Sequence, residues 1–346
     1  MLKRFCLPVF ISIITIINAC KPDGGKTSSE TASESSENKD ETVHLRVSRF
    51  EKDLFAIPFD SVAEKLPALK EKYGPFLDIF SSRRVINIGK PSDPEYPKNL
   101  KSFITDRYMF LTYKKVMEVY PDLNVQTTEI EEAFNKYHEI FPEKAVPHIY
   151  TLISGYNQSI ITADTMLGIS LDKYLDQNCE YYSNLGLPFY QRRLMNKEYL
   201  TTDALRGWCY SEFLFNDSAE NVLTNLLYEG KIIYLTKQLF PEKHDTIIFG
   251  YSSKHLNWVK QNIEPMWTFL IEKKLVFSTD YMTINKLINP APFTALFNNE
   301  SPGRAAVYVG YRIIDSYMRN NKVSIPQLIA DENYQGILEK SKFQPK

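Results

Sequence analysis

The stretch His148–Leu175, HIYTLISGYNQSIITADTMLGISLDKYL, is the part of the chain from which we infer the fold class. It contains three short runs rich in β-branched and apolar residues, His148–Ile153, Ser159–Thr162 and Met166–Ser170, which are joined through the turn sequences GYN and AD. Short runs separated by turn residues are typical of hairpin-connected strands. We therefore predict a small antiparallel sheet in the middle of the chain.

Helical patterns surround this segment on both sides. Upstream, the alternation in Leu45–Phe50 predicts an edge strand, and apolar spacing predicts helices from about Asp60 and from Asn99 to Tyr120. The second of these should end before Pro121 and should direct four residues inward: Phe103, Tyr108, Leu111 and Val116. Downstream, every apolar segment has helical spacing, Asp203–Phe215 and Leu223–Phe240 among them. Strands followed by a helical block predict an α+β fold, a mostly helical single domain with one small sheet.

The N-terminus has the pattern of an export signal. Lys3 and Arg4 precede an apolar run, Phe5–Ile17, that is shorter than the roughly 20 residues of a membrane-spanning helix. The run ends in Ile17-Asn18-Ala19-Cys20, which resembles a bacterial lipobox. We predict a lipoprotein signal peptide over residues 1–19 and lipid attachment at Cys20, since several acyl chains anchor a protein stably. The alternative is a secreted protein in which Cys20 merely lies near the cleavage site.

Composition divides the rest of the chain into two parts. Residues 20–43 are mostly Ser, Thr, Glu, Lys and Gly, which predicts a disordered tether, and residues 44–346 are predicted to form the globular domain. A formal net charge of −1 gives no electrostatic case for binding nucleic acid. Two cysteines remain in the domain, Cys179 and Cys209, and they form either a disulfide or two small apolar side chains in the core.

Five longer stretches carry a resemblance to a known family. They are VSRFEKDLF, EKYGPFLDIFSSRRVINIG, LLYEGKIIYLTKQLFP, GYSSKHLNWVKQNIEPMWTFLIEKKLVFSTD and INPAPFTALFNNESPGRAAVYVGYRIIDSYM. With them the chain resembles the gliding-motility lipoprotein GldB family of the Bacteroidota, over nearly its whole length. The resemblance implies a degenerate zincin-like fold, distantly related to zinc metallopeptidases, and a role in gliding motility with the linked protein secretion machinery.

The histidines do not follow the metallopeptidase pattern that this kinship would suggest. A zinc peptidase of that class needs two histidines at i and i+4 with a glutamate between them. His138-Glu139 begins such a motif, but Pro142 stands in place of the second histidine, and His244 and His255 are eleven residues apart. We therefore predict structural roles for the histidines, no bound metal or other cofactor, and no catalytic residue.

A cleft is predicted around four other residues. Asp203 lies on the helix where an active-site helix would follow the strands, and Glu229 lies in LLYEGK. Gly303 and Arg304 lie at the start of the last long helix, where Ser301 and Pro302 are expected to cap and begin it. An arginine there is unfavourable with the helix dipole, so it should meet a carboxylate or a ligand. The segment NPAPF, 289–293, is expected to form a wall of the same cleft.

Each of these residues also has a plain structural interpretation. Glu229 could be a surface residue before a glycine at which two helices pack, and Arg304 could be paired for stability alone. From the resemblance and the missing zinc ligands we predict a non-catalytic accessory or scaffold lipoprotein, anchored in the outer membrane by its N-terminal lipid, facing the periplasm and bound to envelope partners. The alternative is a cleft-bearing hydrolase, or a lipoprotein that binds peptide or glycan.

Overall fold

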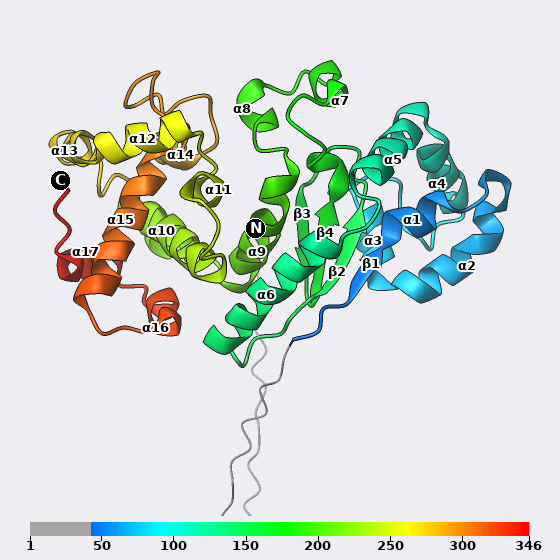
Figure 1. Cartoon of the computed structure of the whole chain (residues 1–346), viewed down its shortest axis with the longest axis horizontal. Helices are drawn as coiled ribbons and strands as arrows, with labels where there is room; N and C mark the ends of the chain where they lie inside the picture. Colours follow the sequence, from blue (N-terminus) through cyan, green and yellow to red (C-terminus); the bar gives the residue numbers. More distant parts are fainter. Residues whose placement is uncertain (1–42, 346) are drawn as a thin grey trace, which may run out of the picture. The chain divides into compact units, whose positions relative to one another are not determined.

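The computed structural model describes residues 43–345, all of which belong to one compact unit. The predicted signal peptide, Cys20 and the tether up to residue 42 lie outside the described residues. Within the described part, no helix combines the length and the apolar character that crossing a membrane requires. The predicted α+β class is confirmed, because one small sheet is surrounded by helices (Figure 1).

The sheet has four strands: β1 (Val47–Arg49), β2 (His148–Leu152), β3 (Ile160–Ala163) and β4 (Met166–Ser170). Their spatial order is β1-β2-β4-β3, so the predicted edge strand is indeed at an edge. The prediction of an antiparallel sheet is wrong for two of the three pairings. β1 with β2 and β2 with β4 are parallel, and only β3 with β4 is antiparallel. The sheet is mixed.

The connections explain this topology. Six α-helices, α1 to α6, lie between β1 and β2 in the chain, and such a long crossover allows parallel pairing. β3 and β4 form a hairpin with two residues at the turn, of which Asp164 has a φ of 44°. The loop between β2 and β3 is held by the buried carboxylate of Asp172, which accepts hydrogen bonds from the backbone N–H of Ser154 (3.1 Å) and Tyr156 (2.6 Å). In the sheet, β4 lies between β2 and β3, the two strands that precede it in the chain.

The N-terminal helices lie mostly beside the sheet. They are α1 (Phe50–Phe55), the 3₁₀ turn Phe59–Ser61, α2 (Val62–Tyr73), α3 (Pro75–Ser81), α4 (Tyr96–Thr105), α5 (Arg107–Val119) and α6 (Asn124–Ile140). The helix predicted from Asn99 to Tyr120 is thus two helices. Asp106 caps α5 by accepting from the backbone N–H of Tyr108 (2.9 Å) and Met109 (3.0 Å). This new start changes the helical phase, so Tyr108 is 70% exposed and not inward, whereas Val116 is buried as predicted.

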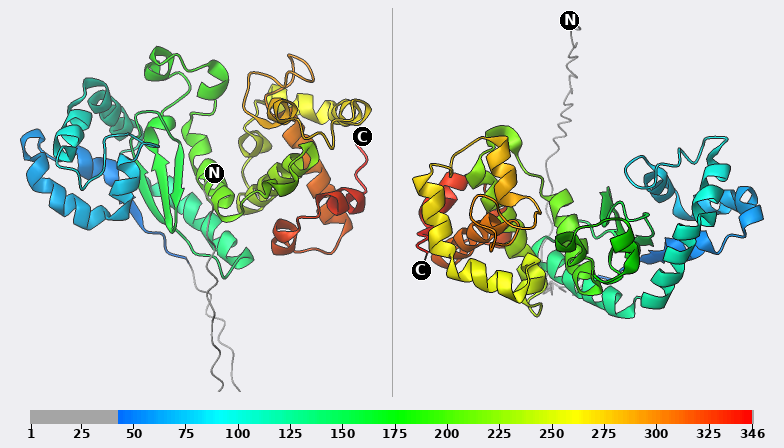
Figure 2. Two further views of the ribbon diagram at one scale, coloured as in Figure 1. Left: turned by 180° about the vertical axis from the view of Figure 1, so that it is seen from behind. Right: turned by 90° about the horizontal axis from the view of Figure 1, so that it is seen from above.

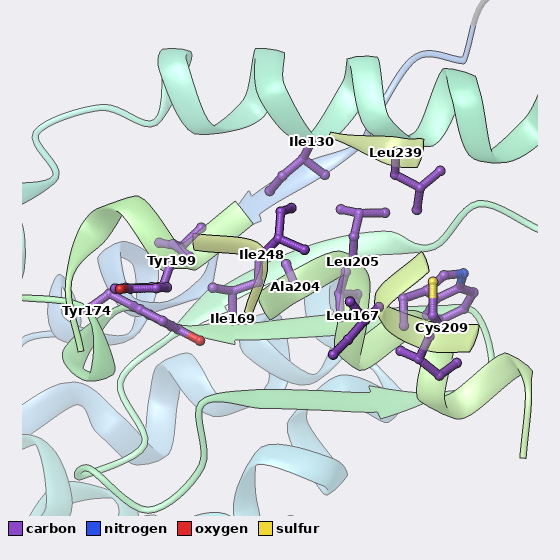
Figure 3. Packing of buried hydrophobic residues seen from close by; sticks show 14 of the residues in the cluster. Ile130, Leu167, Ile169, Tyr174, Tyr199, Ala204, Leu205, Cys209, Leu239 and Ile248 are labelled. Atoms are coloured by element: carbon purple, nitrogen blue, oxygen red, sulfur yellow. The ribbon is translucent and has the colours of Figure 1, made fainter. Parts of the chain in front are cut away.

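Helices cover both faces of the sheet. On one face, Phe76 of α3 stacks on Tyr150 of β2 with ring centroids 4.1 Å apart. On the other face, α6 and α9 (Leu200–Glu212) bury a shared core, in which Ile130, Ile169 and Leu205 lie together (Figure 3). Cys209 is buried in this core and Cys179 is half-buried, and both thiols are free. Of the two alternatives for these cysteines, the structure therefore has the one without a disulfide.

The remaining helices lie beyond α9, on the side away from the sheet (Figures 1 and 2). They are α10 (Val222–Leu239), α11 (Asp245–Phe249), α12 (Ser253–Gln261), α13 (Ile263–Glu272), α14 (Tyr281–Ile288), α15 (Ala305–Asn320), α16 (Ile325–Ala330) and α17 (Tyr334–Ser341). The shorter elements between β4 and α10 are the helices α7 (Glu180–Asn184) and α8 (Phe189–Arg192) and the 3₁₀ turns Leu171–Lys173, Lys197–Tyr199 and Asp217–Ala219. The helices predicted at 203–215 and 223–240 are confirmed as α9 and α10, although α9 ends three residues before the predicted end. Because α9 contacts both β3 and α10, it joins the sheet to the C-terminal helices.

Candidate functional site

A cleft of about 490 Å³ lies among the residues that the structure describes. Segments far apart in the sequence enclose it: α8 and the residues after it, α9, the α11–α12 connection, and the loop before α15. Three residues of the predicted cleft line it directly, namely Asp203, Gly303 and Arg304. The fourth, Glu229, binds Arg304 from behind. The structure thus brings all four together.

Helix α9 carries a stripe of polar side chains, of which Asp203 and Arg206 line the cleft. Asp203, Arg206 and Tyr210 follow one another at i, i+3 and i+7, so they lie on one helix face. In the same stripe, Gly207 lies against β3, where a Cβ atom would come within 2.6 Å of the Ile160 side chain. A larger residue at Gly207 would therefore push α9, with its polar stripe, away from the sheet.

Two glycines set the crossing of α10 and α15. A Cβ atom on Gly310 would lie 1.9 Å from the carbonyl oxygen of Leu226, and one on Gly230 would lie 2.6 Å from the carbonyl carbon of Gly310. The two backbones are therefore in direct contact. This close approach brings Glu229, the neighbour of Gly230, to the N-terminal end of α15. There its Oε2 accepts a hydrogen bond from Nη2 of Arg304 at 2.5 Å.

Arg304 occupies a backbone conformation that is unfavourable for it. It is the residue before α15 and has φ 62° and ψ 25°, in the left-handed region that costs a non-glycine residue about 1–2 kcal/mol. The fold holds it there from three sides. Its Nε donates to the carbonyl of Ile288 (2.8 Å), its own carbonyl accepts from Oη of Tyr251 (3.0 Å), and Glu229 binds the guanidinium. Strain maintained in this way is common at functional sites.

The start of α15 differs from the sequence prediction. Ser301 was expected to cap the helix, but α15 begins at Ala305, whose N–H donates to Oγ1 of Thr294 (2.9 Å). Ser301 instead closes the preceding loop, where its Oγ accepts from the backbone N–H of Thr294 (3.0 Å). Gly303 packs so closely that a Cβ atom would be 2.1 Å from the carbonyl oxygen of Ala291. The NPAPF segment lines the cleft through Pro290, Ala291 and Pro292.

Hydrogen bonds and charges couple the acidic residues to this arginine. Tyr210 donates to Oε2 of Glu229 (2.6 Å), and Tyr174 donates to Oδ2 of Asp203 (3.1 Å). Burial raises the pKa of Asp203, while Arg206, Tyr174 and Arg304 act in the opposite direction. Burial alone would lower the pKa of Arg304, but the Glu229 carboxylate and the hydroxyls of nearby tyrosines raise it above its ordinary value. Arg304 is therefore permanently charged.

A family model matches almost the whole chain. The family model described as gliding motility protein GldB matches residues 31–345. The chain belongs to the GldB family. This membership indicates an envelope lipoprotein of gliding motility, as the resemblance implied. Comparisons with curated proteins and with solved structures return no match. The zincin-like kinship therefore stays a prediction.

Two further arginines of this GldB family member reach the cleft and were not among the predicted cleft residues. Nη2 of Arg206 donates to the carbonyl of Ile248 (2.5 Å), and Arg193 donates to the carbonyl of Gly250. The spacing of Asp203, Arg206 and Tyr210 on one helix face was a signal from which Arg206 could have been chosen. Arg193 follows a short loop helix and has no such signal.

The histidines are scattered over the GldB fold. His148 lies on β2 with Nε2 2.9 Å from Oγ of Ser48, and His244 caps α11. His255 lines the cleft, and its buried Nδ1 has no hydrogen-bond partner within the described residues. Burial lowers its pKa, and the nearby Arg193 and Lys254 lower it further. Over residues 43–345, no three His, Cys, Asp or Glu side chains are grouped so that they could hold a metal ion.

Proposed function

We propose that this GldB family member is an acylated lipoprotein that acts without catalysis, as an accessory or scaffold of gliding motility and the linked protein secretion machinery. The observation that carries the proposal is the family match over residues 31–345, which includes every element of the described domain. The lipobox-like sequence ending in Cys20 lies shortly before the matched region and supports attachment through lipid.

In this proposal the lipid anchor is inserted in the outer membrane and the domain lies in the periplasm. There the domain binds envelope proteins of the same machinery. The export signal directs the chain out of the cytoplasm, and acyl chains on Cys20 hold it at a membrane surface. Both free thiols of the domain are at least half-buried, which is compatible with an oxidising compartment, since thiols in such positions react slowly.

The non-catalytic part of the proposal is supported by the state of Glu229. A general base needs a carboxylate that can reach a substrate proton directly or through one water. The Glu229 carboxylate is already bound by the guanidinium of Arg304 and the hydroxyl of Tyr210, and its side chain is only 15% exposed. Such a carboxylate holds two helices and a tyrosine together and is poorly placed to take a proton from a substrate.

Complementation in a gliding host tests the proposal. Deleting the gene should abolish gliding, and a wild-type copy should restore it. Cys20→Ser should leave the protein outside the outer-membrane fraction, because the lipid is attached through the thiol. Glu229→Gln keeps the shape of the side chain and should still support gliding, as should the matched control Glu242→Gln at an exposed position.

Two results would contradict the proposal. Normal gliding of the deletion strain would remove the motility role. Loss of gliding in Glu229→Gln, with unchanged circular dichroism and expression and with no more than a small loss of stability, would show that the charge itself has a chemical task, and would favour the cleft-bearing hydrolase.

A further inference from the structure

Three arginine side chains meet at the cleft from three separate parts of the chain. Each guanidinium is fixed by a bond to a backbone carbonyl: Arg193 to Gly250, Arg206 to Ile248 and Arg304 to Ile288. A guanidinium has five N–H donors, so one or two bonds leave others for a ligand. The clearest case is Nε of Arg206, which is buried and has no partner within the described part of the chain.

The charges at the cleft do not balance. Three arginines line it, against one carboxylate of the lining, Asp203, and one behind it, Glu229. Three positive charges less two negative charges leave one positive charge, and His255 adds none at neutral pH because its pKa is lowered by burial and by Arg193. A ligand with one negative charge would therefore neutralise the cleft. Guanidinium groups match the planar carboxylate particularly well.

The other walls of the cleft are apolar. They consist of aromatic side chains and prolines, among them Phe189, Phe249 and Pro292. Phe189 is 60% exposed at the rim, where it can cover an arriving apolar group. A small inorganic anion would leave these walls uncovered. The volume of about 490 Å³ falls in the range of pockets that enclose small organic ligands.

Two features favour a peptide over an acyl chain as the apolar part of the ligand. The unpartnered Nδ1 of His255 needs a polar group, which a peptide backbone offers and a hydrocarbon chain does not. In addition, Asp203 and Arg206 also line a second cleft of about 350 Å³, together with Ser159 and Tyr174. The polar stripe of α9 thus lies between two adjoining hollows, which suits a chain longer than one residue.

We infer that the arginine cleft binds the C-terminal end of an apolar polypeptide segment, with its terminal carboxylate on Arg193, Arg206 and Arg304. This inference deepens the proposed function. It rests on that proposal because it treats the cleft as a binding site without catalysis. The ligand is recognised by its carboxylate and its apolar side chains, and the segment would belong to a partner protein of the envelope.

Calorimetric titration of the full-length protein in detergent tests the carboxylate first. The probes are the tripeptides N-acetyl-Ala-Leu-Phe and N-acetyl-Ala-Leu-Val as free acids, their C-terminal amides, and octanoate. We expect the acids to bind about tenfold or more tightly than the amides, because bonds to an ionised acceptor are the stronger ones. Equal binding of acid and amide, or no binding of either acid at millimolar concentration, would overturn the inference. Octanoate binding as tightly as the peptides would overturn its peptide part.

Variants of the arginines test the site. Arg206→Gln and Arg193→Gln should each weaken the free acids by about tenfold and leave the amides nearly unchanged. Arg206→Lys should restore only part of the loss, because an ammonium cannot form the bidentate pair. Arg319→Gln, at an exposed arginine on α15, is the matched control and should bind normally. Arg206 and Arg193 hold different carbonyls of the α11 segment, so if one variant is unstable the other remains for the test.

This test and the test of the proposed function fail in different ways. If deletion abolishes gliding and neither acid binds, the motility role stands and the inference is wrong. If the acids bind through the arginines and deletion leaves gliding intact, the binding site stands and the proposed function is wrong.

Discussion

Two arginine–glutamate pairs, one in each half of the domain, have the same closest N···O distance of 2.5 Å and very different surroundings. Arg49 and Glu51 lie next to β1, with side chains 16% and 0% exposed, and Arg304 and Glu229 lie beside the cleft at 28% and 15%. In the first pair both carboxylate oxygens are used, by Arg49 and by Oγ1 of Thr151 (2.7 Å). The first pair is enclosed, and the second is at the edge of a cleft.

The difference teaches what each pair can do. Arg49 and Glu51 are two residues apart, and the pair joins β1 and α1 to β2, while Arg49 also donates to the carbonyl of Tyr120 (3.0 Å). The hydrogen-bonding groups of this pair are therefore used within the fold and not for a ligand. The other two residues are 75 positions apart and meet only because α10 and α15 cross at two glycines. Its arginine still faces the cleft, so this pair can take part in binding.

The largest expected effect comes from breaking the enclosed pair. Glu51→Ala leaves the guanidinium of Arg49 without its carboxylate and Thr151 without its acceptor, so we expect a loss of about 3–5 kcal/mol in the free energy of unfolding. Urea denaturation followed by circular dichroism measures it. Asp60→Ala, at an exposed pair with Lys101, should leave the midpoint unchanged. A small loss in Glu51→Ala would mean that the enclosed pair does not stabilise the sheet.

The second effect separates the cleft pair without changing a charge. In Gly310→Ala the new Cβ atom would meet the Leu226 carbonyl oxygen, so α10 and α15 must move apart. We expect a loss of about 3 kcal/mol, at the upper end of overpacking costs, together with loss of peptide binding at the cleft. Thermal denaturation and the titration described above measure the two. Arg319→Ala on the same helix is the control. Unchanged stability would show that the crossing has room that the structure does not indicate.

A buried lysine, Lys231, extends the comparison. A backbone carbonyl and an aromatic ring bind this lysine, whereas a carboxylate binds each of the two arginines. Lys231 of α10 is 2% exposed, donates to the carbonyl of Asp331 (2.5 Å) and lies 4.7 Å from the ring centre of Tyr334. Burial lowers its pKa to about 8, although Asp331 and Glu332 act in the opposite direction. The folded protein therefore releases this proton at a lower pH than the unfolded chain does.

The sign of the pH dependence follows directly. Between the folded pKa and the unfolded value of 10.5 the unfolded chain holds more protons, so stability rises with pH. We expect the wild type to gain about 2 kcal/mol relative to Lys231→Met between pH 8 and pH 10. Urea denaturation of both proteins over this range measures the difference, in which the other titrating groups largely cancel. A difference that stays constant or falls would contradict the burial argument.

The smallest effect is expected at the cleft pair itself. Glu229→Gln keeps the acceptor for Tyr210 and Arg304 and removes only the charge, at a position that solvent partly reaches. We expect a loss of about 1 kcal/mol in the free energy of unfolding, well below that of Glu51→Ala. Asp315→Asn, in the more exposed pair with Arg319, is the control and should change stability by less than about 0.5 kcal/mol. A loss equal to that of Glu51→Ala would erase the distinction between the two pairs.

The sequence predicts the strands better than their pairing. The alternation near Val47 and the runs after His148 mark strand positions, because side-chain periodicity is a local property. Pairing depends on which strand reaches which edge. The short link between β2 and β3 suggested a hairpin, but the buried carboxylate of Asp172 holds that link as a loop, and β4 pairs with both strands. No periodicity in the sequence reveals such a contact.

The candidate site could likewise be predicted only where its residues form a local sequence pattern. An arginine at a helix start and a glutamate before a glycine are local oddities, and the structure brings Arg304 and Glu229 together. Arg193 and Tyr251 have ordinary neighbours in the sequence and reach the cleft only through the tertiary packing. Likewise, the Ser301 cap was wrong because the residue that accepts from the first helical N–H, Thr294, is eleven positions away.

The contact between Gly207 and Ile160 bears on how a ligand would be received. The Ile160 side chain of β3 fills the space next to Gly207, so the polar stripe of α9 has little freedom to shift toward the sheet. The arginines are fixed by backbone carbonyls in the same way. A cleft built on such supports is preorganised, so the entropy lost on binding would come mainly from the ligand. Free and bound forms should then share one backbone, and selection among ligands would rest on fit to a fixed shape.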